Sequence, residues 1–186
     1  MKVRLHATHL EGLLLVEVPV YEDPRGFFME SWNKRDFARA GLDADFVQDN
    51  HSRSAAGVLR GLHYQNMTAP IGKLVRCTLG SVFDVAVDLR TGSRTFGQWF
   101  GVELDARNRT QIYVPAGFAH GFVTLSEAAE VQYRQTGFYD RGAEAAIRWN
   151  DPEIAIEWPV RDPLLSERDR TEAISFEEYR RNPAFA

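Results

Sequence analysis

The stretch LRGLHYQNMTAPIGKLVRC, residues 59 to 77, has the pattern of a β-hairpin that carries charged and titratable residues within an apolar run. Arg60, His63 and Lys73 stand among Leu, Val and Gly residues. Polar groups placed beside an apolar interior need hydrogen-bonding partners or a ligand. We therefore expect these three residues to form the floor of a pocket that binds an anionic ligand.

The strand predicted over residues 57–65 does not by simple alternation bring Arg60 and His63 together. Side chains of a strand point alternately to opposite faces, so His63 shares a face with Leu59 while Arg60 lies on the other. Gly61 lies between them and permits a β-bulge, which would re-aim one of the two side chains. A common pocket for both residues therefore requires an irregularity at this glycine.

Two further predicted strands supply polar side chains on apolar faces. Lys73 shares a face with Val75 on one strand, and Tyr133 shares a face with Val131 on another. In a small barrel His63, Lys73 and Tyr133 can all point inward. Each of these residues taken alone has an ordinary structural explanation, as a paired histidine, a solvated lysine or a core tyrosine. The functional hypothesis therefore depends on the combination.

The rest of the chain is rich in short predicted strands separated by turns. Such a series favours a closed or double-sheet β fold, and a jelly roll is the first choice. Asn33 and Gly41 are suited to cap a short helix between them, and SFEEYRR near the end is a second helical segment. Strands are expected at 13–20, with Pro19 favouring an edge position, and at 45–50, 57–65, 72–79, 82–89, 99–104, 111–115, 120–125 and 129–136, with turns at 22–26 and 79–81 and a polar loop or helix start at LLSERDR.

Length and composition limit the class of protein. A chain of 186 residues suits one domain, and 44% apolar residues suffice for a sizeable core. The net charge of −4 gives no support for nucleic-acid binding. Without a basic-then-apolar leader or an apolar run of membrane-spanning length, we expect a cytoplasmic protein that does not bind membranes. Cys77 is the single cysteine and is expected in the core, with a catalytic thiol as the alternative.

The segment PAGFAHGF, residues 115 to 122, places His120 as the second metal motif of cupins does. The first cupin motif would supply two histidines and a glutamate, whereas this chain has only His63 followed by Tyr64 and Gln65. Stable metal sites usually need three or four protein ligands, and Lys73 nearby would repel a cation. We therefore predict that no metal is bound.

Nine segments between about Leu13 and Asp169 form a set that is specific only when taken together. They are DPRGFFMESW, FVQDNHS, LRGLHYQ, GKLVRC, GSVFDVAVDLR, TFGQW, VPAGFAHGF, IRWNDPEIAIEWP and LSERD. With these segments the chain closely resembles the dTDP-4-dehydrorhamnose 3,5-epimerase family, a cupin-like group of nucleotide-sugar enzymes. The resemblance implies an all-β, cupin-like double-stranded β-helix with a few short peripheral helices, and no cofactor.

The resemblance implies a nucleoside-diphosphate 4-keto-6-deoxyhexose as substrate, epimerised at C3 and C5. The ketone acidifies the neighbouring C–H groups, and His63 resembles the base that removes a proton. Asp169 would orient the His63 ring, and Lys73 would stabilise the enolate oxygen. Tyr133 would return a proton from the opposite face of the ring.

Binding residues follow from the same resemblance. Arg60 and Arg25 resemble ligands of the diphosphate, for which a guanidinium fork is well shaped. The family forms homodimers in which N-terminal segments cross to the partner, and the Phe27-Phe28 pair beside Arg25 is compatible with that arrangement. Further family pocket positions are matched by Glu30, Gln48, Asn50, His120, Tyr139, Glu144 and Arg168, the last standing where many relatives have Lys.

Several alternatives remain open from the sequence. The enzyme could invert C3 alone or act on a CDP- or GDP-linked sugar, and the segment after Asp169 departs from the LSxKD-x-x-x-Pro-x-Leu pattern of many relatives. A non-catalytic jelly roll that binds nucleotide sugars is a second class of function. A related 3,4-ketoisomerase shares the fold and substrate class but fits less well, because it lacks the motif match from GLHYQ to GKLVRC. Arg25 could be a simple turn residue, and Glu30 a surface carboxylate.

Overall fold

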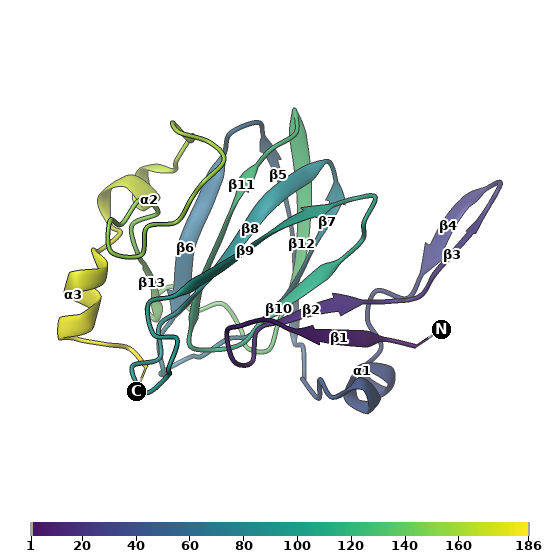
Figure 1. Ribbon diagram of the computed structural model, residues 1–186, viewed down its shortest axis with the longest axis horizontal. Coiled ribbons are helices and arrows are strands. Elements are labelled where there is room, and N and C mark those ends of the chain that lie inside the picture. The colour runs from purple at the N-terminus through teal and green to yellow at the C-terminus, as the bar shows by residue number, and fades with distance from the viewer. Residues whose placement is uncertain (1, 186) are drawn as a thin grey trace.

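A computed structural model describes residues 2–185 and shows two antiparallel sheets packed face to face (Figure 1). One sheet has six strands in the order β1 (Arg4–Ala7), β2 (Leu14–Glu17), β10 (Gln111–Val114), β7 (Lys73–Leu79), β12 (Ala128–Gln135) and β5 (Gln48–Ala55). The other has five, in the order β13 (Glu144–Ala146), β6 (Leu59–Gln65), β11 (Phe118–Thr124), β8 (Ser81–Asp88) and β9 (Trp99–Asp105). The predicted all-β jelly roll is confirmed.

The space between the sheets holds the main core. Inward side chains of both sheets meet there, among them Val75 and Ile112 from one sheet and Val82, Leu104 and Phe122 from the other. Cys77 belongs to this core and is 4% exposed, so its prediction as a core residue is confirmed. Burial raises the pKa of its thiol to about 11, which keeps it protonated at neutral pH.

Strand boundaries differ from the sequence prediction near the N-terminus. The expected strand 13–20 is broken at Pro19, and the chain continues as a separate hairpin of β3 (Val20–Asp23) and β4 (Gly26–Met29). Because Pro19 lies outside β2, it does not force that strand to an edge, and β2 pairs with β1 and β10. The edge strands β1 and β13 were not predicted, and β5 begins and ends later than the expected 45–50.

The hairpin β3–β4 projects from the body of the molecule at the end opposite the C-terminal helices (Figure 1). Its aromatic side chains Phe27 and Phe28 are 56% and 69% exposed. Arg109 contacts the hairpin near its turn, since the guanidinium lies 4.2 Å from the centroid of the Phe27 ring and donates to Glu22, which pairs with Phe27, at 2.8 Å. The arm is therefore fixed in direction while its apolar surface stays open.

Each of the three helices within residues 2–185 has a side-chain N-cap, of which only the one at Asn33 was predicted from the sequence. Helix α1 (Lys34–Ala40) begins after Asn33, whose side chain accepts from two backbone N–H groups, and ends at Gly41 with φ 113°. Ser175 forms a capping box with Glu178 at α3 (Phe176–Arg181). The polar segment near Ser166 forms the short helix α2 (Glu167–Thr171). No helix within residues 2–185 is long and apolar enough to cross a membrane.

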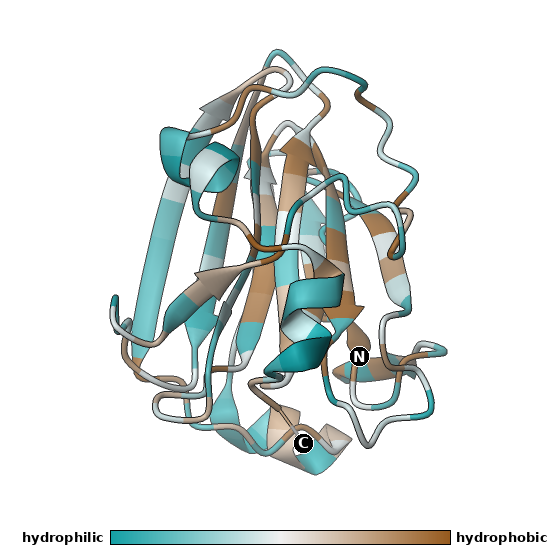
Figure 2. Cartoon of the chain, turned by 90° about the vertical axis from the view of Figure 1, so that its left-hand side faces the viewer, coloured by the Kyte–Doolittle hydropathy of each residue, from teal (hydrophilic) through white to brown (hydrophobic). Residues whose placement is uncertain are grey.

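The C-terminal segment covers the outer face of the five-stranded sheet. Leu62 and Tyr64 of β6 pack there against Phe176, Tyr179 and Phe185. Figure 2 views this side, with helices bearing hydrophilic residues in front of strands that have hydrophobic segments. This sheet is therefore apolar on both faces over part of its area. For this reason its strands have continuous hydrophobic stretches of sequence.

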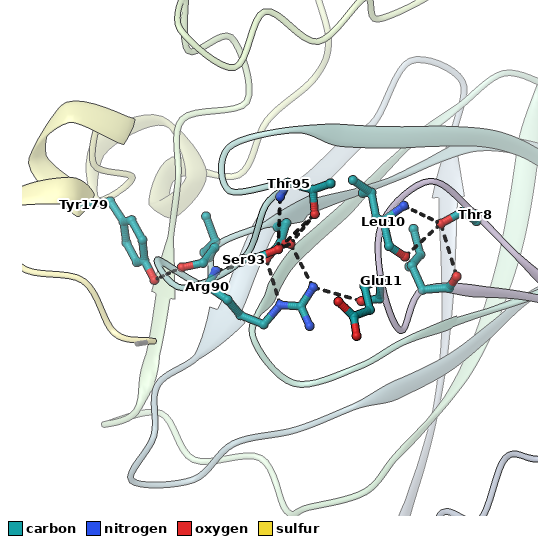
Figure 3. A network of polar contacts seen from close by, with 10 residues as sticks. Thr8, Leu10, Glu11, Arg90, Ser93, Thr95 and Tyr179 are labelled. Carbon is teal, nitrogen blue, oxygen red and sulfur yellow. Dashed lines mark hydrogen bonds and ion pairs between the residues drawn. The ribbon is translucent and has the colours of Figure 1, made fainter.

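A buried carboxylate at the end of β8 holds the loop that follows this strand, and the same loop is bonded to the covering segment (Figure 3). Asp88 is fully buried and accepts from Arg90, Ser93 and Thr95 at distances of 2.6 to 3.0 Å. Burial alone would raise the pKa of Asp88, but these hydrogen bonds outweigh it and hold the pKa below its usual value. Next to it, the Tyr179 hydroxyl donates to the Leu89 carbonyl at 2.7 Å.

Strands β6 and β11 approach each other closely at two glycines. The pairing shifts there, since His120 lies opposite His63 while Phe122 lies opposite Arg60, so β6 contains one extra residue. Gly61 has φ 133°, and a Cβ atom on it would lie 2.5 Å from the Gly121 Cα atom. The bulge that Gly61 permits is present, and only glycine fits at this place.

Replacing Gly61 with Ala should lower the free energy of unfolding more than replacing Gly26 does. Both glycines have φ near 130°, so both variants carry backbone strain, but a Cβ at Gly26 meets nothing within 4 Å. The clash at Gly61 should cost about 1–3 kcal/mol more. Urea unfolding of Gly61→Ala and Gly26→Ala measures the difference. Equal losses would show that the contact with β11 is not tight.

Candidate active site

A cavity of about 480 Å³ opens at one end of the barrel, between the sheets and the segment that contains α2. Charged and titratable side chains from both sheets and from that segment reach it. The lining residues are Ser52, Val58, Leu59, Arg60, His63, Lys73, His120, Phe122, Tyr133, Glu144, Leu164, Leu165, Ser166, Arg168 and Asp169.

His63 and Asp169 form a hydrogen-bonded pair in this cavity. The His63 Nε2 atom lies 2.5 Å from the Asp169 Oδ1 atom, and the carboxylate side chain is 4% exposed. Burial acts to raise the pKa of Asp169, but the hydrogen bond from His63 and the Ser166 hydroxyl that caps α2 outweigh it, so the pKa is lowered. The carboxylate therefore fixes the imidazole and leaves its other ring nitrogen to accept a proton.

Lys73 and Tyr133 come from the neighbouring strands β7 and β12 and line the same cavity. Burial lowers the pKa of Lys73 to about 8, while the carboxylates of Glu144 and Asp84 act in the opposite direction. Burial also raises the pKa of Tyr133, so its phenol is protonated at neutral pH. The cavity thus contains an imidazole, an ammonium and a phenol.

The bulge brings Arg60 into the cavity beside His63. The Arg60 Nε atom donates to the Ser54 hydroxyl at 3.0 Å, and the Nη2 atom donates to the Arg53 carbonyl at 3.4 Å. Ser54 is 5% exposed, so it fixes the guanidinium from a buried position. Sequence reasoning missed Ser54, because a serine on a strand gives no signal of its partner.

A second imidazole–carboxylate pair lies on the adjacent strands β8 and β11. The His120 Nε2 atom contacts both carboxylate oxygens of Asp84 at 2.9 and 3.0 Å, and Asp84 is fully buried. His120 lies directly opposite His63 in the strand pairing. Sequence reasoning missed Asp84, although an acid inside the apolar run SVFDVAV is a signal of a buried, paired carboxylate.

Glu144 and Arg168 form an ion pair at the side of the cavity, and the Tyr139 hydroxyl donates to Glu144 at 2.8 Å. The structure therefore groups eight of the residues expected from the sequence around one cavity. These are His63, Lys73, Tyr133, Asp169, Arg60, His120, Glu144 and Arg168.

The other expected residues lie elsewhere in this chain. The Gln48 side chain donates to Asn50 at 2.9 Å and accepts from the Tyr139 N–H at 3.0 Å, and neither Gln48, Asn50 nor Tyr139 lines the cavity. Arg25 lies on the projecting hairpin with its side chain 90% exposed and paired with Asp23. Glu30 is exposed and accepts from Asn33 at 3.1 Å. Within one chain, therefore, the hairpin contributes nothing to the cavity.

No group of three or more His, Cys, Asp or Glu side chains among residues 2–185 is arranged to hold a metal ion. The residues at the cavity instead combine cations suited to an anion with the imidazoles of His63 and His120 and the phenol of Tyr133. Such a set suits proton transfer on an anionic ligand.

Residues 7–178 match the model of the family described as dTDP-4-dehydrorhamnose 3,5-epimerase. The chain belongs to this family. The epimerase-family relative from Pseudomonas aeruginosa, named dTDP-4-dehydrorhamnose 3,5-epimerase, is 62% identical over 163 residues, which are 87% of this chain and 90% of that protein.

Two solved structures of the epimerase family also match closely. RmlC from Legionella pneumophila, solved in complex with dTDP-4-keto-L-rhamnose, is 46% identical with a TM-score of 0.87, and the match covers 92% of each chain. ChmJ, a 3′-monoepimerase from Streptomyces bikiniensis solved with dTDP-quinovose, is 34% identical with a TM-score of 0.90 and covers 97% of this chain and 91% of that one. The family thus contains both double and single epimerases with one fold.

Replacing Lys73 with Met should stabilise the fold at pH 7 by roughly 1–3 kcal/mol, because the buried ammonium is disfavoured relative to the unfolded chain. Between pH 8 and 10.5 the unfolded wild-type chain binds more protons than the folded one, so wild-type stability rises with pH there. The advantage of the variant should shrink over this range. Urea unfolding at pH 7 and pH 10 tests both points, and a variant less stable at pH 7 would contradict them.

Proposed function

We propose that this protein epimerises a dTDP-linked 4-keto-6-deoxyhexose at C3 and C5, converting dTDP-4-dehydro-6-deoxy-D-glucose to dTDP-4-dehydro-L-rhamnose. One observation carries the proposal: the His63–Asp169 pair, Lys73 and Tyr133 line a single cavity. The named relatives support the nucleotide and the sugar, since dTDP-4-keto-L-rhamnose is the ligand of the Legionella enzyme.

The proposed reaction needs two proton carriers and one electrophile. His63 removes the proton from the carbon next to the ketone, and Asp169 stabilises the imidazolium that forms. Electrons of the broken C–H bond move to the ketone oxygen, where the Lys73 ammonium stabilises the enolate. A preorganised donor of this kind contributes about 10²–10³ in rate.

Inversion requires that the new proton arrive on the other face of the ring. The Tyr133 phenol donates this proton to the carbon as the enolate returns to the ketone, and the phenolate then takes a proton from water. His63 releases its proton to water, so the protein ends as it began. Burial favours the neutral phenol, which keeps Tyr133 in the donor form at neutral pH.

The diphosphate is assigned to the cationic side of the cavity. Arg60 is held there by Ser54 and Arg53 and retains donors that these two contacts do not use. A guanidinium binds phosphate oxygens through two parallel hydrogen bonds. Arg25 is proposed as a second phosphate ligand.

A C3-only epimerase is the second candidate, because relatives of this chain include ChmJ and a dTDP-4-dehydrorhamnose 3-epimerase from Streptomyces niveus that is 40% identical over 169 residues. The 62% identical Pseudomonas relative favours the double epimerase. A binding protein without catalysis would use the cations but has no need of an imidazole and a phenol in one cavity.

In D₂O the wild-type protein should introduce deuterium at both C3 and C5 of dTDP-4-keto-6-deoxyglucose, followed by NMR. His63→Ala should abolish the exchange, since no other proposed group removes the proton. Tyr133→Phe should retain exchange at one face but lose most of the inverted product. Exchange at C3 alone would favour the single epimerase, and binding of the substrate without any exchange would reject catalysis.

We propose further that two chains form a homodimer in which each β3–β4 arm reaches the cavity of the partner. The arm is fixed in direction by Arg109, yet Phe27 and Phe28 remain exposed and Arg25 is 90% exposed. Exposed aromatic pairs on a projecting element are typical of an interface. The arm would bring Arg25 and Glu30 to the partner's nucleotide.

Subunit complementation tests this arrangement. Arg25→Ala and His63→Ala homodimers should both be poorly active, whereas a purified heterodimer of the two contains one site with both native residues. It should therefore recover about half of the wild-type activity per dimer. If each arm served its own chain, both sites of the heterodimer would be defective and activity would stay low.

A further inference from the structure

Helix α2, which carries Asp169, belongs to a strap whose two ends are bonded to the five-stranded sheet. At one end Leu164 exchanges backbone hydrogen bonds with Gly57 and Leu59 at 2.8 and 3.0 Å. At the other end Ile174 donates to the Ala146 carbonyl at 3.0 Å. Between these anchors the helix is only five residues long, so it depends on tertiary contacts for its position.

Two consecutive side chains of α2 are bonded to two adjacent strands. Asp169 contacts His63 on β6, and Arg168 pairs with Glu144 on β13. The pairing of these strands fixes the distance between the two contacts, since Ala146 lies opposite His63 and Glu144 lies opposite Gln65. With Asp169 alone the helix could pivot about a single hydrogen bond, whereas two contacts fix its rotation.

We propose that Arg168 is a positioning residue that acts through Glu144 to hold Asp169 in place against His63. The inference rests on the proposed proton-abstraction role of His63. The resemblance had implied that Arg168 binds substrate, but its guanidinium contacts Glu144 and also donates to Glu172 at 3.2 Å. Its Nη1 and Nε atoms are thus engaged by carboxylates of the protein.

The environment of Glu144 explains why a cation is needed at position 168. The Glu144 side chain is 13% exposed, and removing its partner would leave a largely buried carboxylate unpaired. A carboxylate without a counter-ion would move toward another cation or become hydrated. Either change would shift the start of β13 relative to helix α2. Lysine retains the charge but offers one point contact in place of a planar fork.

Steady-state kinetics of three variants separates positioning from substrate binding. Arg168→Ala should lower kcat by about 10- to 100-fold through misorientation of the dyad. Its affinity for dTDP, measured by calorimetry, should stay within about twofold of wild type, and Arg168→Lys should recover most of kcat. Arg170→Ala is the matched control, because Arg170 is an exposed arginine on the same helix, and it should behave as wild type.

The pairing with Glu144 is tested by a double-mutant cycle. Glu144→Gln should already release Arg168, so adding Arg168→Ala to it should lower kcat little further. Fully additive losses of kcat would show that the two residues act separately and would overturn the proposal that Arg168 acts through Glu144.

A spectroscopic measurement tests the same idea without any turnover. In ¹⁵N-labelled protein, the N–H proton that His63 shares with Asp169 should give a downfield resonance, assigned by its loss in His63→Asn. It should persist in Arg168→Lys and Arg170→Ala and be lost or broadened in Arg168→Ala. A resonance unchanged in Arg168→Ala would overturn the positioning role, as would an unchanged kcat with weakened dTDP binding. Wild-type protein that shows the resonance but no deuterium exchange would instead reject the proposed function.

Discussion

The contact between Gly61 and Gly121 is the constraint on which the cavity depends. It allows β6 to hold one extra residue against β11, and that residue changes which side chains face inward. Arg60 and His63 consequently line one cavity, while Leu62 and Tyr64 pack against the C-terminal cover on the outside. A regular strand would have placed Arg60 and His63 on opposite faces of the sheet.

The cavity combines groups that are individually costly to bury. Lys73 loses hydration there, and Asp84, Asp169 and Glu144 are carboxylates with little access to water. Each acid has a specific partner, His120, His63 or Arg168, which limits the cost of burial. Lys73 is less fully compensated, so the cavity gives up some stability to hold an ammonium that its proposed role requires.

Much of the fold could be predicted because strand periodicity and turn residues agree with the tertiary structure. The strand runs through Lys73 and Tyr133 were predicted with the correct inward faces, since β7 and β12 are regular beside these residues. Alternation alone places Arg60 and His63 on opposite faces, and the expectation of one pocket depended on the bulge that Gly61 permits, because a bulge changes the alternation without changing composition. Asp84 and Ser54 were not predicted as site residues, because their contribution depends on partners on other strands, His120 and Arg60 respectively.

The C-terminal segment that covers the five-stranded sheet is separate from the cavity. Residues 174–185 pack against the outer face of the five-stranded sheet, with Tyr179 and Phe185 in that apolar cluster, and they do not line the cavity. Substitutions in this tail are therefore limited by how well they fit the apolar cluster, and they should change the stability of the sheet while leaving the lining of the cavity as it is.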